Sequence, residues 1–160
     1  PKNLILAFEI RCQVTTYVDK KIKAYQAQGL TPNIAVQWGN TMRTLMRYCD
    51  AHTVEKVFVL FPDPQFKKKK LKWRIISQQL MDEYAYIMKP GARFYLVTDV
   101  RQYFEYADPL ISSHPLFEKV ADPQNDQCFE LAQNATEESK KVTENGGMKF
   151  AAIWQRKPLD

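Results

Sequence analysis

The sequence predicts an α/β fold in which a mostly parallel sheet carries helices on both faces. Strand patterns and helical patterns alternate along the chain, as they do in proteins with parallel sheets. Residues 56–61, Lys-Val-Phe-Val-Leu-Phe, form an apolar run typical of a strand that is covered on both faces. A length of 160 residues suits one domain, so we interpret 1–160 as a single domain.

The strands and helices are predicted in order from periodicity and from start and stop signals. The expected strands are 4–10, 34–38, 56–61, 93–98 and 150–154, and we expect the last to pair antiparallel at the sheet edge. The expected helices are 11–28, one from about 40, one from about 64 to 89, one from about 100, and one that begins after Thr136. Pro90-Gly91 is predicted to end the third helix and Pro109 to end or kink the fourth.

Composition limits the possible functions without identifying one. The net charge is +5 and the pI is about 9.1, which favours an anionic partner. The longest apolar runs are too short to cross a membrane, so we expect no membrane partner. Three cysteines without metal-ligand spacing and two histidines argue against a metal site and against a histidine-based triad.

The run 61–74 carries the most information about function. Asp63 follows the strand 56–61, at the strand end where open α/β sheets bind their ligands. Pro64 suits a first helical position, so Asp63 is also a candidate N-cap. Six cations then occur within the eight residues 67–74, which indicates a polyanion near this carboxylate. A solvated basic helix face is the alternative.

This run resembles the signature of the tRNA (guanine-N7)-methyltransferases, a Pro-Asp-Pro stretch followed by basic residues. Four further blocks resemble that family in its order: Leu6–Arg11, Gly39–Met42, Tyr95–Asp99 and Asn134–Val142. The blocks cover nearly the whole chain, and two of them look like the eukaryotic branch. Gln65, Leu71 and Ala7 depart from the pattern, because the family has an aromatic residue or histidine, a histidine and a glycine there.

The resemblance implies a Rossmann-like, S-adenosylmethionine-dependent methyltransferase fold. The implied reaction is methyl transfer from S-adenosyl-L-methionine to N7 of a guanine in tRNA. Guanine N7 already presents an in-plane lone pair, so this reaction requires no general base. The resemblance also implies a WD-repeat propeller subunit as partner and a nuclear location, with the cytoplasm as the alternative.

The family's functional positions fall on particular residues of this chain. Asp63 matches the catalytic position, where a carboxylate can hold the N1–H and N2–H edge of guanine and stabilise the developing positive charge. Matching cofactor-binding positions are Glu9, Arg11, Asn40, Thr41 and Leu60, and matching substrate-binding positions are Lys67, Asp99, Thr136 and Glu138. Lys68, Lys69, Lys70, Lys72 and Arg74 would add salt-dependent attraction to RNA. Each of these residues also has a structural alternative, such as a surface Glu9–Arg11 pair or Thr136 as a helix cap.

The family's first strand and glycine-rich cofactor loop have no counterpart in the sequence. None of the five glycines forms a phosphate-binding or dinucleotide-binding loop, and the first strand already ends at Glu9. We therefore expect a fold that is incomplete at the N-terminus, with open edges on the strands that precede Glu9 and Asp63. The chain is then either a fragment or a variant with a rearranged sheet. A catalytically silent RNA-binding or scaffold module is the alternative function.

Overall fold

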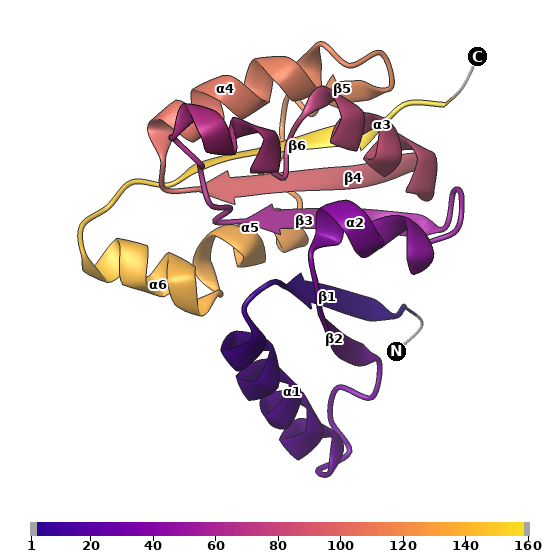
Figure 1. Cartoon of the computed structure of the whole chain (residues 1–160), viewed down its shortest axis with the longest axis vertical. Coiled ribbons are helices and arrows are strands. Elements are labelled where there is room, and N and C mark those ends of the chain that lie inside the picture. Colours follow the sequence, from indigo (N-terminus) through magenta and orange to yellow (C-terminus); the bar gives the residue numbers. More distant parts are fainter. Residues whose placement is uncertain (1–2, 159–160) are drawn as a thin grey trace. The chain divides into compact units, whose positions relative to one another are not determined.

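The computed structural model describes residues 3–158, which divide into two compact units at the boundary between Tyr48 and Cys49 (Figure 1). Each unit has its own strands and helices. The interpretation of the chain as a single domain stays a prediction.

The first unit is a two-stranded parallel sheet with one long helix. β1 (Ile5–Glu9) pairs with β2 (Ile34–Trp38) along its whole length, and α1 (Cys12–Gln26) connects the two strands and packs against both. Both strands occur where the sequence predicts them. The helix predicted from about residue 40 is short: α2 (Thr41–Thr44) continues only as a 3₁₀ turn, η1 (Leu45–Arg47).

β1 is largely exposed, although the apolar run at residues 4–8 is typical of a buried strand. Ile5 is 52% exposed and Leu6 is 39% exposed. A sheet of two strands with one packed helix covers little of its apolar surface, and within residues 3–158 the second edge of β1 has no strand partner. The open edge expected on this strand is therefore present.

The second unit contains a mixed four-stranded sheet in the order β3-β4-β6-β5, which confirms the α/β class. β3 (Val54–Leu60) and β4 (Met88–Thr98) are parallel. β6 (Phe150–Arg156) is antiparallel to β4, as predicted, and to β5 (Phe117–Lys119). β6 is not at the sheet edge, because the three-residue β5, which the sequence analysis missed, pairs with its outer side. In the described part of the chain β3 is an edge strand, as expected for the strand before Asp63.

Helices cover both faces of this sheet, as Figure 1 shows. Phe94 points toward α3 (Gln78–Ile87), where its ring lies 5.3 Å from that of Tyr84. Tyr95, the next residue of β4, points to the opposite face and donates a hydrogen bond to Asp126 at the start of α5 (Gln127–Asn134). The remaining helices are α4 (Arg101–Ser112), which packs on β6 and β4, and α6 (Glu137–Glu144).

The basic run does not begin an α-helix, so that prediction is wrong. A loop follows β3, Lys68–Trp73 form the 3₁₀ helix η2, and α3 begins only at Gln78. The N-cap of α3 is Ser77, whose hydroxyl accepts a hydrogen bond from the Leu80 amide. Four adjacent lysines repel one another and oppose the partial positive charge of a helix N-terminus, which explains why the long helix starts beyond them.

Pro90-Gly91 lies inside a strand rather than after a helix. α3 ends at Ile87 and β4 begins directly at Met88. The pairing with β3 shifts from Val54↔Met88 to Lys56↔Arg93, so the Pro-Gly pair lies in an irregular part of the ladder that does not need its amide groups. Pro109 does not end α4, which continues to Ser112.

Candidate active site

Asp63 lies on a strained turn that directly follows β3. The Phe61 amide donates to Val97 O at 2.7 Å and so extends the ladder between β3 and β4. Phe61 and Gln65, on either side of Asp63, have φ values of 49° and 48° in the left-handed region. Such a conformation costs a non-glycine residue about 1 to 2 kcal/mol. Strain of this kind is often found at functional sites, which supports Asp63 as a functional residue.

One carboxylate oxygen of Asp63 holds the turn and the other is available. Oδ1 accepts a hydrogen bond from the Gln65 amide at 3.0 Å, and the carboxylate is exposed. Asp63 is therefore not the N-cap of a helix, because it closes a local turn of the Asx type instead. Within residues 3–158 no hydrogen bond reaches Oδ2, so this oxygen can accept one from a ligand.

Asp99 and Glu138, two predicted substrate-binding residues, line a common hollow of about 280 Å³. Asp99 follows the carboxyl end of β4 and Glu138 lies in the first turn of α6. Lys141 and Asn145 also line the hollow, and the Lys141 amine lies 3.6 Å from the Glu138 carboxylate. The hollow thus combines two carboxylates with one amine. Since β3 and β4 are parallel neighbours, Asp63 and Asp99 follow the same edge of the sheet.

Thr136 is the N-cap of α6, which is the structural alternative given by the sequence. Its hydroxyl caps α6 by accepting a hydrogen bond from the Ser139 amide at 3.0 Å. Lys149, which the sequence analysis missed, holds the start of this helix against the end of α5. Its amine donates to Gln133 O at 2.7 Å, to the Ser139 and Thr143 hydroxyls at 3.0 Å each, and to Asn134 Oδ1 at 3.3 Å. A single lysine before a strand gives no sequence signal for this role.

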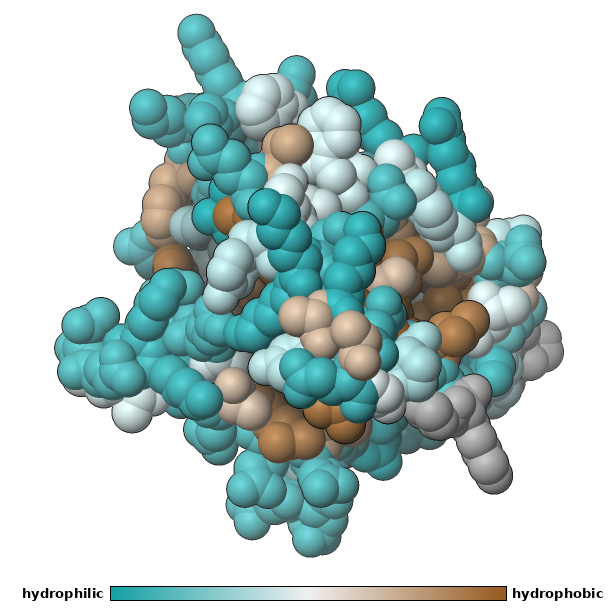
Figure 2. Space-filling model, turned by 90° about the horizontal axis from the view of Figure 1, so that it is seen from below, coloured by the Kyte–Doolittle hydropathy of each residue, from teal (hydrophilic) through white to brown (hydrophobic). Residues whose placement is uncertain are grey.

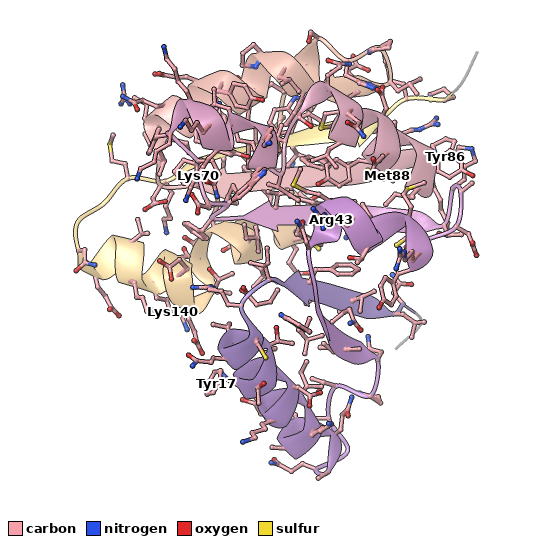
Figure 3. The ribbon with its side chains drawn as sticks, in the orientation of Figure 1. Tyr17, Arg43, Lys70, Tyr86, Met88 and Lys140 are labelled. Carbon is pink, nitrogen blue, oxygen red and sulfur yellow. The ribbon has the colours of Figure 1, made fainter. Side chains whose placement is uncertain are left out.

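The lysines of the basic run are exposed and lie beside the Asp63 turn. Lys67 has an extended backbone at the N-cap position of η2, and its side chain makes no capping hydrogen bond there. Figure 3 shows Lys70 in this segment, at the end of the sheet toward which β4 points. Two large aromatic side chains are exposed among the lysines, Phe66 at 55% and Trp73 at 57%. The segment therefore presents both cations and rings to solvent.

The first unit brings four of the predicted cofactor residues to the ends of its two strands. Glu9 Oε1 accepts from the Arg11 amide at 2.8 Å and from Arg11 Nε at 3.1 Å, which lowers the pKa of Glu9 and keeps it ionised. The Gly39 amide donates to Glu9 O at 3.0 Å, so the turn after β2 lies next to the end of β1. Asn40 Oδ1 caps α2 by accepting from the Met42 amide, and Thr41 is the first residue of that helix.

Leu60 belongs to the second unit, where it ends β3 half-buried and opposite Val97. The second unit therefore contains Leu60, Asp63, Lys67, Asp99, Thr136 and Glu138, whereas Glu9, Arg11, Asn40 and Thr41 belong to the first. Their roles in binding and catalysis stay predictions.

The face that Figure 2 draws is predominantly hydrophilic, with hydrophobic side chains among the polar ones. Across residues 3–158, no helix combines the length and apolar character needed to span a membrane. The same described residues contain no group of three or more histidine, cysteine or acidic side chains arranged to hold a metal ion. The three cysteines are free.

Comparison with solved structures gives the class of the fold. A 16S rRNA methyltransferase, KamB, matches 97% of this chain and 77% of its own, with a TM-score of 0.59 and 17% sequence identity. An antibiotic-related methyltransferase matches 96% of this chain and 75% of its own, with a TM-score of 0.63 and 14% identity. At these identities the likeness establishes the fold alone. The chain thus has the fold of the methyltransferases that use S-adenosylmethionine.

Sequence comparison gives the family. Residues 1–152 match the family described as "putative methyltransferase". The tRNA (guanine-N(7)-)-methyltransferase of Botryotinia fuckeliana is 42% identical over 98% of this chain and 57% of its own length. The enzymes of the same name from Caenorhabditis elegans and Anopheles gambiae are 41% and 42% identical, over 64% and 68% of their lengths. The chain belongs to this methyltransferase family, which confirms the resemblance seen in the motifs. It spans about three fifths of the length of the first curated relatives it matches.

Proposed function

We propose that this chain carries the catalytic region of a tRNA (guanine-N7)-methyltransferase, which transfers a methyl group from S-adenosyl-L-methionine to a guanine N7. The observation that carries this proposal is the Asp63 turn. This turn places an exposed carboxylate at the carboxyl edge of the sheet, and one of its oxygens accepts no hydrogen bond from the described residues. The named relatives of the chain carry the name of this reaction. The exposed lysines follow it directly.

The reaction requires the protein to position the two reactants and to offset the developing charge, and it requires no general base. Guanine N7 reacts through a lone pair that lies in the ring plane, and the ring becomes cationic as the new bond forms. Asp63 Oδ2 would accept hydrogen bonds from the N1–H and N2–H groups and would offset this positive charge. The carboxylates of Asp99 and Glu138 line the hollow described above, and Asp99 follows the same edge of the sheet as Asp63; these carboxylates would also favour hydrogen-bond donors of the base.

The residues of the first unit fit the ribose side of S-adenosyl-L-methionine. Glu9 is ionised at the end of a parallel strand, which is the position where acidic residues bind ribose hydroxyls in related α/β folds. Its Oε2 accepts a single hydrogen bond, from Arg11 Nη2, among the contacts described, so further acceptor capacity remains. Asn40 and Thr41 would lie on the adenine side. The cofactor, when bound, supplies the methyl group on a positively charged sulfur.

The basic segment would bind tRNA. Lysines at positions 67–70 and 72 are exposed and would pair with backbone phosphates, which predicts strong salt dependence. Phe66 and Trp73 expose rings on which unpaired bases can stack. We propose Lys67 as a direct contact to the target nucleotide or to its phosphate.

A WD-repeat propeller partner and a nuclear location, with the cytoplasm as alternative, belong to the same proposal. They are supported by the eukaryotic-like blocks around Trp73 and Thr136 and by the eukaryotic relatives. Co-purification of a tagged chain would test the partner, and imaging of the same chain would test the location.

The experiment that tests the function is methyl transfer from labelled S-adenosylmethionine to unmodified tRNA. It would compare this chain, with and without a propeller subunit, with a chain extended upstream by the first strand and glycine-rich loop of a relative. Borohydride–aniline cleavage would show whether the label is on N7. If none of these chains incorporates label although tRNA binding is retained, the silent RNA-binding alternative is favoured. The names of the relatives do not support that alternative. Calorimetry with S-adenosylhomocysteine separates the two independently, since clear binding contradicts a silent module.

A further inference from the structure

Arg74 behaves differently from the lysines that precede it. The lysines at 67–70 and 72 are exposed, whereas Arg74 is half-buried and its Nε donates a hydrogen bond to Pro64 O at 2.9 Å. Pro64 is the residue directly after Asp63. The last cation of the basic run is therefore bonded to the backbone of the Asp63 turn, ten residues earlier in the chain.

The guanidinium of Arg74 also lies against two rings of α4. Its Cζ atom is 4.1 Å from the ring centroid of Tyr106 and 5.7 Å from that of Tyr103. Tyr103 is completely buried, so its ring is a fixed support. The Tyr106 hydroxyl donates to Ile76 O at 3.1 Å, which attaches the chain just after Arg74 to the same helix. Arg74 thus connects α4 to the Asp63 turn.

The turn needs such a connection because its backbone is strained. Phe61 and Gln65 both have left-handed φ values without being glycine, and the Pro64 carbonyl lies between them. Residues keep such conformations only where surrounding contacts determine them. The Gln65 amide bond to Asp63 is one restraint from within the turn, and Arg74 provides one from outside it.

We propose that Arg74 is a positioning residue that holds the Asp63 turn in its reactive shape, and that it is not one of the cations that bind RNA. The proposal rests on the proposed function only in so far as Asp63 is the catalytic carboxylate. The physical link, from the Tyr103 and Tyr106 rings through Arg74 to Pro64 O, is independent of the reaction. Displacement of a reacting group by about 1 Å can lower a rate by as much as about a hundredfold.

The test compares Arg74→Ala with Lys72→Ala, which removes an exposed cation two residues away in the same segment. Arg74→Ala should lower kcat about ten- to a hundredfold, with KM for tRNA changed by less than about threefold and the salt dependence of tRNA binding unchanged. Lys72→Ala should weaken tRNA binding and reduce its salt dependence, with kcat nearly retained. If Arg74→Ala reproduces the Lys72→Ala pattern, Arg74 is an RNA ligand and the proposal is wrong.

Two further comparisons separate positioning from a general loss of fold. Tyr106→Phe keeps the ring under Arg74 and loses only the hydroxyl bond to Ile76 O, so it should lower kcat less than Tyr106→Leu, which removes both contacts and should resemble Arg74→Ala. Glycine adopts positive φ without steric cost, so adding Gln65→Gly to Arg74→Ala should recover part of the lost kcat. Failure of the glycine variant to recover any activity, in a protein that retains its circular dichroism spectrum, would contradict a role through the shape of the turn.

Hydrogen exchange decides the proposal even if the chain transfers no methyl group. In Arg74→Ala the hydrogen-bonded amides of the turn, those of Phe61 and Gln65, should exchange at least about tenfold faster than in the unchanged chain, while those of β4 stay protected. Lys72→Ala should leave both regions unchanged. Unaltered exchange of the Phe61 and Gln65 amides in Arg74→Ala would overturn the proposal, whereas absence of methyl transfer from both this chain and the chain extended upstream would overturn the proposed function alone.

Discussion

Replacement of Asp126 by alanine should strongly destabilise the second unit. Asp126 is buried over the face of the sheet opposite α3, and it has three roles at once. Its Oδ1 caps α5 by accepting from the Phe129 amide at 3.1 Å. Its Oδ2 accepts from the buried Tyr95 hydroxyl at 2.8 Å and from Arg93.

The expected cost follows from these three contacts. Loss of a helix cap costs about 1 kcal/mol. A buried tyrosine hydroxyl left without its acceptor costs about 1 to 3 kcal/mol. The Arg93 side chain is 40% exposed, so its ion pair adds at most about 1 kcal/mol. We therefore expect Asp126→Ala to lower the free energy of unfolding by about 3 kcal/mol, and Asp126→Asn, which keeps the cap, by about 1 to 2 kcal/mol.

The same carboxylate makes stability depend on pH. Burial alone would raise the pKa of Asp126, but the hydrogen bonds from Arg93 and Tyr95 outweigh it and hold the pKa below the usual 3.8. The folded state therefore favours the ionised form. Its contribution is complete above about pH 4 and is lost as the pH falls through the lowered pKa. The difference in stability between the unchanged chain and Asp126→Asn should shrink in that range.

Urea unfolding followed by tryptophan fluorescence measures these changes, because Trp154 is completely buried in the same unit. Asp122→Ala is the matched control: Asp122 accepts one hydrogen bond, from the Gln124 amide, in an exposed turn, and its loss should change stability by less than about 0.5 kcal/mol. Equal effects of Asp126→Ala and Asp122→Ala would refute the reasoning, as would a difference for Asp126→Asn that does not change with pH.

Two further predictions concern the helix that carries Glu138. Lys149→Met removes the amine that joins Gln133 O to three side-chain oxygens. We expect this change to lower the free energy of unfolding by about 2 to 3 kcal/mol and to speed hydrogen exchange in α5 and α6. Amide protection in these helices equal to that of the unchanged chain would contradict this role. Thr136→Ala should cost about 1 kcal/mol in thermal or urea unfolding through the lost cap, while Thr136→Ser should cost less than half of that; equal losses in the two variants would show that the hydroxyl does not cap the helix.

The sequence was sufficient for elements whose local signals agree with their surroundings. β2 and the cap at Thr136 occur where hydrophobic period and capping chemistry predict them. Pro90-Gly91 gives an ambiguous sequence signal, because a helix breaker and a bulge in a strand have the same local signature. Which one forms depends on pairing with β3, more than thirty residues earlier in the chain.

The site was predicted less completely than the fold, because its geometry depends on contacts between distant segments. The motif identified Asp63 but predicted it as a helix cap, whereas the structure has a strained turn there. The sequence predicts the same role for Arg74 as for the lysines, because charge alone does not show which side chain turns inward. Lys149 contacts acceptors six to sixteen residues away, and no pattern in the sequence marks it.

Methyl transfer by Asp63→Asn tests the central claim most directly, in whichever form of the chain transfers methyl groups. Asparagine keeps the shape of the side chain and an oxygen for the Gln65 amide, so the turn should persist while the negative charge is lost. We predict that kcat falls about a hundredfold or more, with tRNA affinity changed by less than about threefold. Retention of full activity by Asp63→Asn would contradict the account, because the carboxylate would then have no part in the reaction.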